Sequence, residues 1–306
     1  MTKSKNVFLI TGGYDHSIKL WDVHNGACAR TLQFPDSHIN LLRVSPNKKW
    51  LAVAAHPLIR IYKTDFASNG HLSELMGHTK NVTSVVFDSF GTGLYSCGED
   101  CLVKFWDLRQ GKSVIDFSHA APCSSLALHP CQHIVVSGDN DGHIRIWDVR
   151  ARKCLREMVP EAEVGIRSCS ITPDSSMLVA ANNNGTCFVW RLDPERKTTC
   201  DLSLEPLVQI DAHKTFILRT AVSSNSKYMA TGAGDNTAKI WSLPSFEHVH
   251  TLSAHQRWVW DVEFSGDSNF LFTGSSDNSA RSWNVAQGEA ICSFNGHHKV
   301  TGLCQC

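Results

Sequence analysis

The sequence predicts an all-β fold in which seven four-stranded blades close into a ring. The first observation is a period, because seven short apolar runs each end in a large aromatic residue, 41 to 51 positions apart. The second is a quartet of residue types, His, Ser or Thr, Asp and Trp, that recurs around five of these aromatics. The seven aromatics are Trp21, Tyr62, Trp106, Trp147, Trp190, Trp241 and Trp283.

The repeated quartet, here called the tetrad, keeps fixed offsets. In the third blade, His78 lies 22 positions before Asp100, Ser96 lies four before it and Trp106 lies six after it. A period of this length, with Gly-His or Trp-Asp pairs in several repeats, is typical of the seven-bladed WD-repeat β-propeller. The same offsets relate His119, Ser137, Asp141 and Trp147; His213, Thr231, Asp235 and Trp241; and His255, Thr273, Asp277 and Trp283.

We expect each tetrad to be a buried chain of hydrogen bonds, because polar groups inside a stack of sheets need partners. A Ser/His/Asp set can also be a nucleophilic triad. A triad, however, needs one exposed nucleophile, an oxyanion hole and one substrate pocket, which five buried copies do not provide. The 16 histidines and 12 cysteines show no zinc-ligand spacing. We therefore expect no enzymatic activity, no cofactor and no metal.

The third blade shows the expected order of short strands. They cover Val82–Phe87, Leu94–Cys97, Val103–Trp106 and Ser113–Phe117, with a tight turn at Glu99–Asp100. The other blades follow this scheme. The one long gap between aromatics contains a polar stretch, Asp193 to Pro206, which we interpret as a surface loop.

The chain begins out of phase with its repeat, since Val7–Thr11 and Lys19–Trp21 are the middle strands of a blade that lacks its innermost strand. The last residues, 299–306, are expected to supply that strand and to remove two open sheet edges. Residues 1–306 then form a single propeller domain. His297 completes a fifth tetrad with Thr11, Asp15 and Trp21.

Two blades lack the tetrad and are expected to depend on apolar packing instead. In the second blade, Ala52, His56 and Tyr62 stand in place of the hydroxyl, the Asp and the Trp. In the fifth, Ala162, Ala180 and Asn184 replace His, Ser and Asp, while Trp190 stays.

Composition narrows the class of partner. The chain has 29 basic and 29 acidic residues and no long basic run, so nucleic-acid binding is not indicated. Scattered cysteines without a framework spacing suit reduced thiols inside a cell. We expect neither a signal peptide nor a transmembrane span at the start of this sequence, and no membrane insertion.

Aromatic residues beyond the tetrads are the best candidates for a binding site. They fall where loops meet the innermost strands of three consecutive blades, and a rim of Trp, Tyr and Phe is typical of a protein-binding hot spot. For Trp260, simple packing between blades is an equally good interpretation. The candidate partner-binding residues are Tyr14, Phe216, Leu218, Arg257, Trp258 and Trp260.

Five stretches give a more specific resemblance, to the G-protein-β-subunit-like subunits of the TOR (target of rapamycin) kinase complexes. They are Gly13–Trp21 (GYDHSIKLW), Pro35–Asn40 (PDSHIN), Gly98–Cys101 (GEDC), Val179–Cys187 (VAANNNGTC) and His255–Trp260 (HQRWVW). The likeness extends from the first strand to Gly296–Lys299 and includes the two blades without tetrads.

The resemblance implies a non-enzymatic scaffold subunit of TOR complexes 1 and 2. Such a subunit sits on the C-terminal lobe of the kinase domain, supports its active form in nutrient-responsive growth signalling, and meets other subunits through the kinase. It implies a monomeric ring within a larger complex. It also implies a cytoplasmic location, with peripheral association with endomembranes through the TOR complex.

A competing interpretation is a substrate receptor of a cullin-type ubiquitin ligase. Trp106–Arg109 and Trp147–Arg150 both have the pattern Trp-Asp-x-Arg, which resembles the sequence by which some propellers dock to these ligases. The pattern is weak, because Trp-Asp ends a strand in most repeats of this kind. Arg109 and Arg150 are the residues that distinguish this function from TOR scaffolding.

Overall fold

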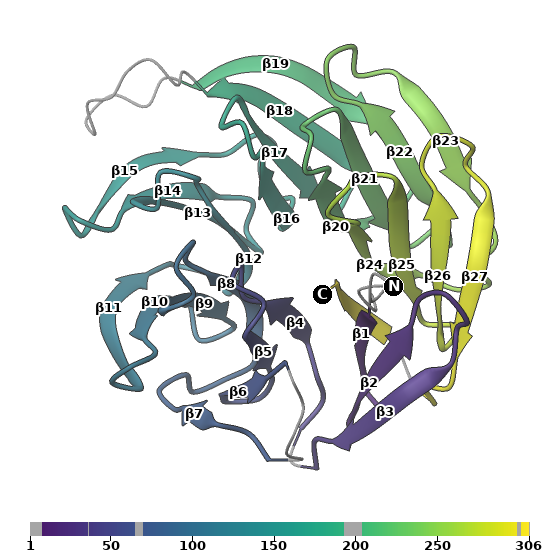
Figure 1. Cartoon of the computed structure of the whole chain (residues 1–306). Coiled ribbons are helices and arrows are strands. Elements are labelled where there is room, and N and C mark those ends of the chain that lie inside the picture. Colours follow the sequence, from purple (N-terminus) through teal and green to yellow (C-terminus); the bar gives the residue numbers. More distant parts are fainter. Residues whose placement is uncertain (1–7, 36, 65–69, 193–203, 299–300, 306) are drawn as a thin grey trace.

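The chain forms a ring of seven antiparallel sheets, each of four strands (Figure 1). The structure is a computed structural model that describes residues 8–35, 37–64, 70–192, 204–298 and 301–305. Within these residues every regular element is a β-strand, and no helix could cross a membrane. The predicted seven-bladed β-propeller is therefore confirmed.

The strands of blades two to seven run in chain order from the centre of the ring to its outside, as Figure 1 shows. Blades one to three contain β28 (Thr301–Gln305), β1 (Phe8–Gly13), β2 (Ser17–Asp22) and β3 (Cys28–Gln33); β4 (Leu41–Val44), β5 (Trp50–Ala54), β6 (Ile59–Lys63) and β7 (Ser73–Leu75); and β8 (Val82–Phe87), β9 (Gly93–Gly98), β10 (Leu102–Asp107) and β11 (Lys112–Ser118).

Blades four to seven repeat this plan. They contain β12 (Cys123–Leu128), β13 (Ile134–Asp139), β14 (Ile144–Asp148) and β15 (Lys153–Met158); β16 (Ile166–Ile171), β17 (Met177–Asn182), β18 (Thr186–Leu192) and β19 (Leu204–Asp211); β20 (Ile217–Val222), β21 (Tyr228–Ala233), β22 (Ala238–Ser242) and β23 (His248–Leu252); and β24 (Val259–Phe264), β25 (Phe270–Ser275), β26 (Ser279–Asn284) and β27 (Ala290–Asn295).

The first blade contains strands from both ends of the chain. Strand β28 pairs antiparallel with β1, so that Thr301 faces Gly13 and Gln305 faces Leu9. In Figure 1 this last strand, in yellow, lies beside the purple β1. Within the predicted closing segment 299–306, residues 299, 300 and 306 lie outside the described part of the chain. The pairing gives blade one four strands like the other six blades.

The turn between the second and third strands of a blade has the same geometry in four blades. The residue after the tetrad Asp has a left-handed backbone, with φ between 60° and 68° at His16, Cys101, Asn236 and Asn278. The Asp side chain accepts a hydrogen bond from the backbone N–H two residues further on, at 3.0 to 3.3 Å. This Asx turn compensates the unfavourable φ and aims the carboxylate into the blade.

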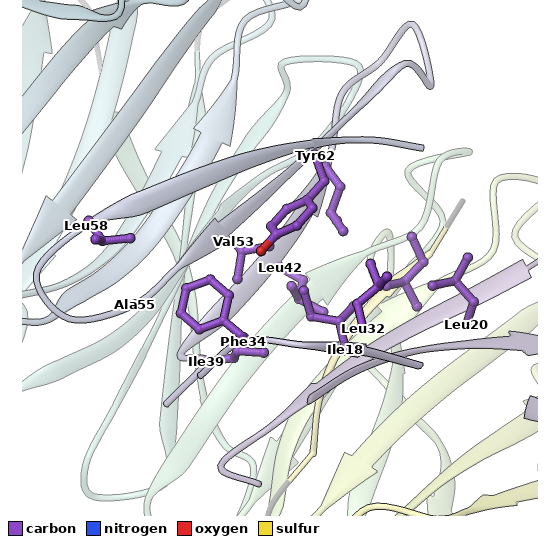
Figure 2. Packing of buried hydrophobic residues seen from close by; sticks show 12 residues of the cluster. Ile18, Leu20, Leu32, Phe34, Ile39, Leu42, Val53, Ala55, Leu58 and Tyr62 are labelled. Atoms are coloured by element: carbon purple, nitrogen blue, oxygen red, sulfur yellow. The ribbon is translucent and has the colours of Figure 1, made fainter. Parts of the chain in front are cut away.

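Blade two, which lacks a tetrad, packs on blade one through a large apolar cluster. Figure 2 shows Ile18 and Leu32 of blade one against Leu42, Val53 and Tyr62 of blade two, and all five are buried. Burying one such side chain contributes on the order of 2 kcal/mol. Apolar packing thus supports the blade where the tetrad is missing, as predicted.

The predicted C-terminal boundary of the surface loop from Asp193 to Pro206 is wrong, because β19 begins at Leu204. Residues 193–203 lie outside the described part of the chain, but Leu204, Glu205 and Pro206 belong to β19. Leu204 faces Leu192 across the β18–β19 ladder, and both side chains are buried in one cluster. The ladder extends because this apolar pair leaves water.

Candidate functional site

Tetrad side chains fix the loops of one face of the ring, here called the upper face. In blade three, Nε1–H of Trp106 donates to Oγ of Ser96 at 2.7 Å, and Nε2 of His78 lies 2.7 Å from the same oxygen. Nδ1 of His78 lies 2.7 Å from a carboxylate oxygen of Asp100. Because a carboxylate only accepts, Nδ1 carries the proton, and Nε2 accepts from the serine hydroxyl.

Three further tetrads make the same contacts at 2.7 to 3.2 Å. They are Thr11, Asp15, Trp21 and His297; Thr231, Asp235, Trp241 and His213; and Thr273, Asp277, Trp283 and His255. The first of these sets joins the two ends of the chain. In it the backbone N–H of His298 also donates to Asp15, at 2.9 Å.

Hydrogen bonding keeps the carboxylates of three tetrads ionised. Burial alone would raise the pKa of Asp235, but hydrogen bonds from His213 and Thr237 outweigh burial and lower it to about 2. The same balance holds the pKa of Asp15 and of Asp277 well below the ordinary range of an aspartate. Each ionised carboxylate fixes its histidine, and with it the loop that carries the histidine.

The prediction that Asp141 belongs to the tetrad of blade four is wrong. Asp141 is exposed, and the buried carboxylate of Asp139 takes its place, with Oδ2 3.3 Å from Nδ1 of His119. Backbone N–H groups of Asp141 and His143 donate to the other oxygen of Asp139 at 3.1 and 2.9 Å. These bonds turn Asp139 inward, so Asp141 points to solvent. His119, Ser137 and Trp147 meet as predicted from their spacing.

Blade five contains polar contacts where apolar packing alone was predicted. The carboxylate of Glu161 accepts from the side-chain amides of Asn182 at 2.6 Å and Asn184 at 2.7 Å. The amide oxygen of Asn182 accepts from the backbone N–H of Asn184 and of Thr186. Glu161 therefore links the loop before the blade to its central turn, as a histidine does in the tetrads.

The tetrads are not arranged as catalytic triads. The Oγ of Ser96 is fully buried and already contacts both Trp106 and His78, so it cannot reach a substrate carbonyl. Burial raises the pKa of Cys97 and of Cys169 to about 12, which leaves both thiols protonated and unreactive. Among the described residues, no group of three His, Cys, Asp or Glu side chains could hold a metal ion.

Four of the candidate aromatic side chains form a continuous row on the upper face. Phe216 meets Trp258 edge to face, with ring centroids 5.1 Å apart, and Trp258 lies 6.0 Å from Trp260. Trp260 lies 6.5 Å from Tyr14. The row, here called the aromatic rim, crosses blades six, seven and one. Trp258 is 45% exposed, the largest aromatic surface available to a partner on this row.

The scaffold holds Phe216 and Trp260 of the aromatic rim in place. Phe216 lies over Gly234, where a Cβ would come 2.5 Å from its ring. Nε1–H of Trp260 donates to the hydroxyl of Ser276 in the neighbouring turn. Trp260 is thus partly buried and also contacts Tyr14, so it serves both packing and the exposed row.

The other two candidates lie beside the rim. Leu218 joins Trp260 in lining a cavity of about 240 Å³ at the mouth of the central channel, next to Arg219 and Asp261. Arg219 pairs with Asp261 at 3.4 Å. Arg257 is exposed in the loop that carries Trp258. The aromatic rim therefore borders a polar, charged cavity, as hot spots with a wet margin do.

Histidine residues extend the row beyond what the repeat predicted. The ring of His38 stacks on Tyr14 with centroids 4.9 Å apart, and His16 follows at 4.7 Å from His38. His38 comes from the link between blades one and two, which has no counterpart at a fixed offset. Its place next to Tyr14 could not be read from the period.

The arginines of the competing interpretation lie at the other face of the ring. Arg109 and Arg150 are exposed in the β10–β11 and β14–β15 turns, at the strand ends opposite to the tetrad turns. In each turn the backbone N–H of the arginine donates to the preceding Asp side chain at 2.8 Å. Both guanidinium groups can reach a partner there.

Comparison with known proteins places this geometry among WD repeats. The family described as WD domain, G-beta repeat matches residues 3–22, 69–107, 111–148, 152–191, 204–242 and 246–284. The unmatched residues 23–68 include most of blade two, which lacks a tetrad.

Relatives that match most of the chain identify the family more specifically than the repeat does. The chain is 40% identical over 237 residues to the target of rapamycin complex subunit wat1 of Schizosaccharomyces pombe, which covers 78% of this chain and 74% of that protein. It is 42% identical over 242 residues to the target of rapamycin complex subunit LST8-1 of Arabidopsis thaliana, covering 79% of each. It is 38% identical over 238 residues to the subunit LST8 of Saccharomyces cerevisiae, covering 78% of each.

Proposed function

This chain belongs to the family of WD-repeat subunits of the target of rapamycin complex, and from that premise we propose that it is a non-enzymatic subunit that binds the TOR kinase. In the proposal it contacts the C-terminal lobe of the kinase domain in both TOR complexes and stabilises its active form in nutrient-responsive growth signalling. Other subunits meet it through the kinase.

The observation that carries the proposal is the aromatic rim. A few hot-spot residues, among which Trp and Tyr are enriched, supply most of the binding energy in protein interfaces, and a polar margin commonly surrounds them. Here Trp258 stands exposed between Phe216 and Trp260. The ring beneath is fixed by tetrads and by interblade clusters, so little order has to be gained when a partner binds.

A rigid surface of this kind can support a kinase without chemistry of its own. If the rim binds one conformation of a movable kinase segment more tightly than the others, it shifts the population toward that conformation. The shift equals the difference in affinity for the two conformations. We propose that the active conformation of the kinase is the one that the rim prefers.

The test compares Trp258→Ala combined with Tyr14→Ala against Phe90→Ala. Phe90 is a matched control, because it is 73% exposed but lies in the β8–β9 turn at the opposite face. We expect the double variant to lose about thirtyfold or more in affinity for the TOR kinase, which corresponds to the loss of a hot spot. The melting temperature of the isolated ring should stay nearly unchanged.

Normal co-purification of the double variant with the kinase would overturn this assignment of the rim. Crosslinks from the rim should map to the C-terminal lobe, and crosslinks confined to another subunit would contradict that part of the proposal. Kinase activity measured with and without the ring tests stabilisation of the active form.

The second candidate, a receptor for a cullin-type ligase, is favoured only by the exposed position of Arg109 and Arg150 in equivalent turns. Charge reversal to Glu at both positions should abolish ligase association if that function holds. It should leave TOR binding unchanged if the scaffold function holds. Affinity purification of the double reversal variant separates the two functions.

We further propose that the ring is a monomer that joins a larger complex, and that it is cytoplasmic, reaching endomembranes only with the TOR complex. Light scattering of the purified chain tests the first statement, and a dimer mass would contradict it. Fluorescence microscopy of the tagged chain after TOR depletion tests the second, since a membrane signal that persists would contradict it.

A further inference from the structure

A second hollow on the upper face lies next to the aromatic rim. It has a volume of about 520 Å³ and opens between the loops of blades one, two and three. Three of its lining residues are His16, His38 and His56, and Tyr14 forms the wall that it shares with the rim. We call it the histidine pocket. A serine and two asparagines complete the lining.

The amides and the hydroxyl of the pocket are already engaged. Asn40 donates its amide to the carbonyl of Val82 at 3.0 Å, and Asn81 donates to Glu99 at 3.2 Å. The hydroxyl of Ser37 accepts from the backbone N–H of His56 at 3.0 Å. One N–H of each amide and the serine hydroxyl are thus engaged, and the imidazoles are the only groups of the described lining that can carry a positive charge.

The imidazoles themselves are incompletely paired within the described part of the chain. Nδ1 of His38 lies 3.1 Å from the carbonyl oxygen of Tyr14, which can only accept, so this nitrogen is the donor. Nδ1 of His16 is buried and has no hydrogen-bond partner among the described residues. A buried polar atom without a partner is unfavourable, and a ligand that supplies the partner recovers that free energy.

We propose that the histidine pocket receives an aspartate or glutamate side chain of the protein that docks along the aromatic rim. The inference rests on the proposed function, because it needs a partner on the rim. The pocket and the rim are continuous through Tyr14, whose ring stacks on His38 and lies 6.5 Å from Trp260. A partner that covers Trp258 and Trp260 can therefore reach the pocket across Tyr14.

Charge favours a carboxylate over the alternatives. The described lining contains three imidazoles and no carboxylate. Phosphate groups are usually bound by Arg or Lys side chains, and the described lining has neither. A metal ion is disfavoured because the described residues hold no suitable group of three ligands. A single carboxylate matches one or two imidazolium donors.

The acidic side chain gives the interaction a dependence on pH. Histidine side chains gain a positive charge as the pH falls from about 8 to 5. The charged and titratable neighbours of the pocket are Tyr14, Asp15 and Glu99. Asp15 accepts hydrogen bonds from His297 and from the backbone N–H of His298, and Glu99 accepts one from Asn81. Asp36 precedes Ser37 and lies outside the described residues. Because a carboxylate favours the protonated imidazole, binding should strengthen as the pH falls.

The experiment measures the Kd of the ring for purified TOR kinase, taken from cells depleted of this chain, at pH 7.5 and pH 5.8. We expect the Kd to fall about tenfold at the lower pH, the effect of one hydrogen bond to a charged group. The test variant is His16→Asn with His38→Gln and His56→Gln. Asparagine suits position 16, because Asn236 and Asn278 occupy the equivalent left-handed turn position.

The triple variant should keep its melting temperature and show the same Kd at both pH values, whatever the value of that Kd at pH 7.5. The control His24→Gln, at an exposed histidine of the other face, should keep the full pH dependence. Equal pH dependence of the unchanged ring and the triple variant overturns the inference, and so does a flat Kd of the unchanged ring. Loss of the dependence after phosphatase treatment of the kinase overturns the choice of a carboxylate. No binding of the unchanged ring at either pH contradicts the proposed function itself.

Discussion

The guanidinium group of Arg145 donates a hydrogen bond to Nδ1 of His119 across 2.6 Å. Arginine has no acceptor, so Nδ1 is unprotonated, and the neutral ring carries its proton on Nε2. That Nε2–H then donates to Ser137, whose oxygen also accepts from Trp147. The hydrogen bond between His119 and Ser137 thus runs in the opposite direction to that between His78 and Ser96, while the tryptophan donates to the serine in both blades. Burial lowers the pKa of His119 and keeps its ring neutral.

This arrangement predicts different roles for two aspartates that are two positions apart. Asp139→Asn replaces a fully buried acceptor of Arg145 and of two backbone N–H groups, and should lower the free energy of unfolding by about 2 kcal/mol. Asp141→Asn changes an exposed side chain and should stay within about 0.5 kcal/mol of the unchanged chain. Urea unfolding monitored by tryptophan fluorescence checks both, and equal losses would contradict the assignment.

A backbone position controls the first residue of the aromatic rim. Gly234→Ala places a Cβ 2.5 Å from the ring of Phe216, which must move away from Trp258. The lost edge-to-face contact is worth about 0.5–1.5 kcal/mol. We expect TOR kinase to bind about three- to tenfold more weakly, with little change in melting temperature. Gly266→Ala meets no atom within 4 Å and serves as the control. If the Gly234→Ala variant binds the kinase as tightly as the unchanged ring does, Phe216 does not contribute to binding.

The tetrad carboxylates predict how the ring responds to acid. Burial raises the pKa of Asp235, but hydrogen bonds from His213 and Thr237 have the larger effect and bring the pKa down to about 2. An aspartate with a lowered pKa stabilises the fold fully above its unfolded pKa of about 4, and this contribution is lost as the pH falls through the folded value. The free energy of unfolding should therefore drop between about pH 4 and pH 2. Asp235→Asn should be less stable at pH 7 and show a shallower drop, and an equally steep drop would refute the linkage.

Period and residue type predicted the parts of the molecule that repeat. The offsets of His78, Ser96 and Trp106 predicted the fold, because a buried hydrogen-bond chain fixes the spacing of its members. The row from Phe216 to Tyr14 could also be predicted from the sequence, since equivalent offsets in adjacent blades place side chains side by side. Closure by β28 was predicted because the first blade lacked a strand.

The remaining features depend on positions that the period does not mark. Asp141 keeps the 22-residue offset, yet the backbone N–H groups of Asp141 and His143 bind the side chain of Asp139 and turn it inward. Spacing does not distinguish the two aspartates. His38 and His56 come from loops between and within blades whose paths depend on local packing. Only their contacts with Tyr14 and with Ser37 reveal the histidine pocket.

Blade five offers the sharpest comparison of a paired and an exposed carboxylate. Glu161 accepts from the amides of Asn182 and Asn184 at once, and Asn182 is fully buried. Glu161→Gln keeps one oxygen and replaces the other with an amide donor, so one asparagine loses its acceptor. The free energy of unfolding should fall by about 1–3 kcal/mol. Glu163→Gln, an exposed residue of the same loop, should change it by less than about 0.5 kcal/mol. If both variants unfold at the same urea concentration, Glu161 does not replace the missing tetrad histidine, and blade five depends on apolar packing alone.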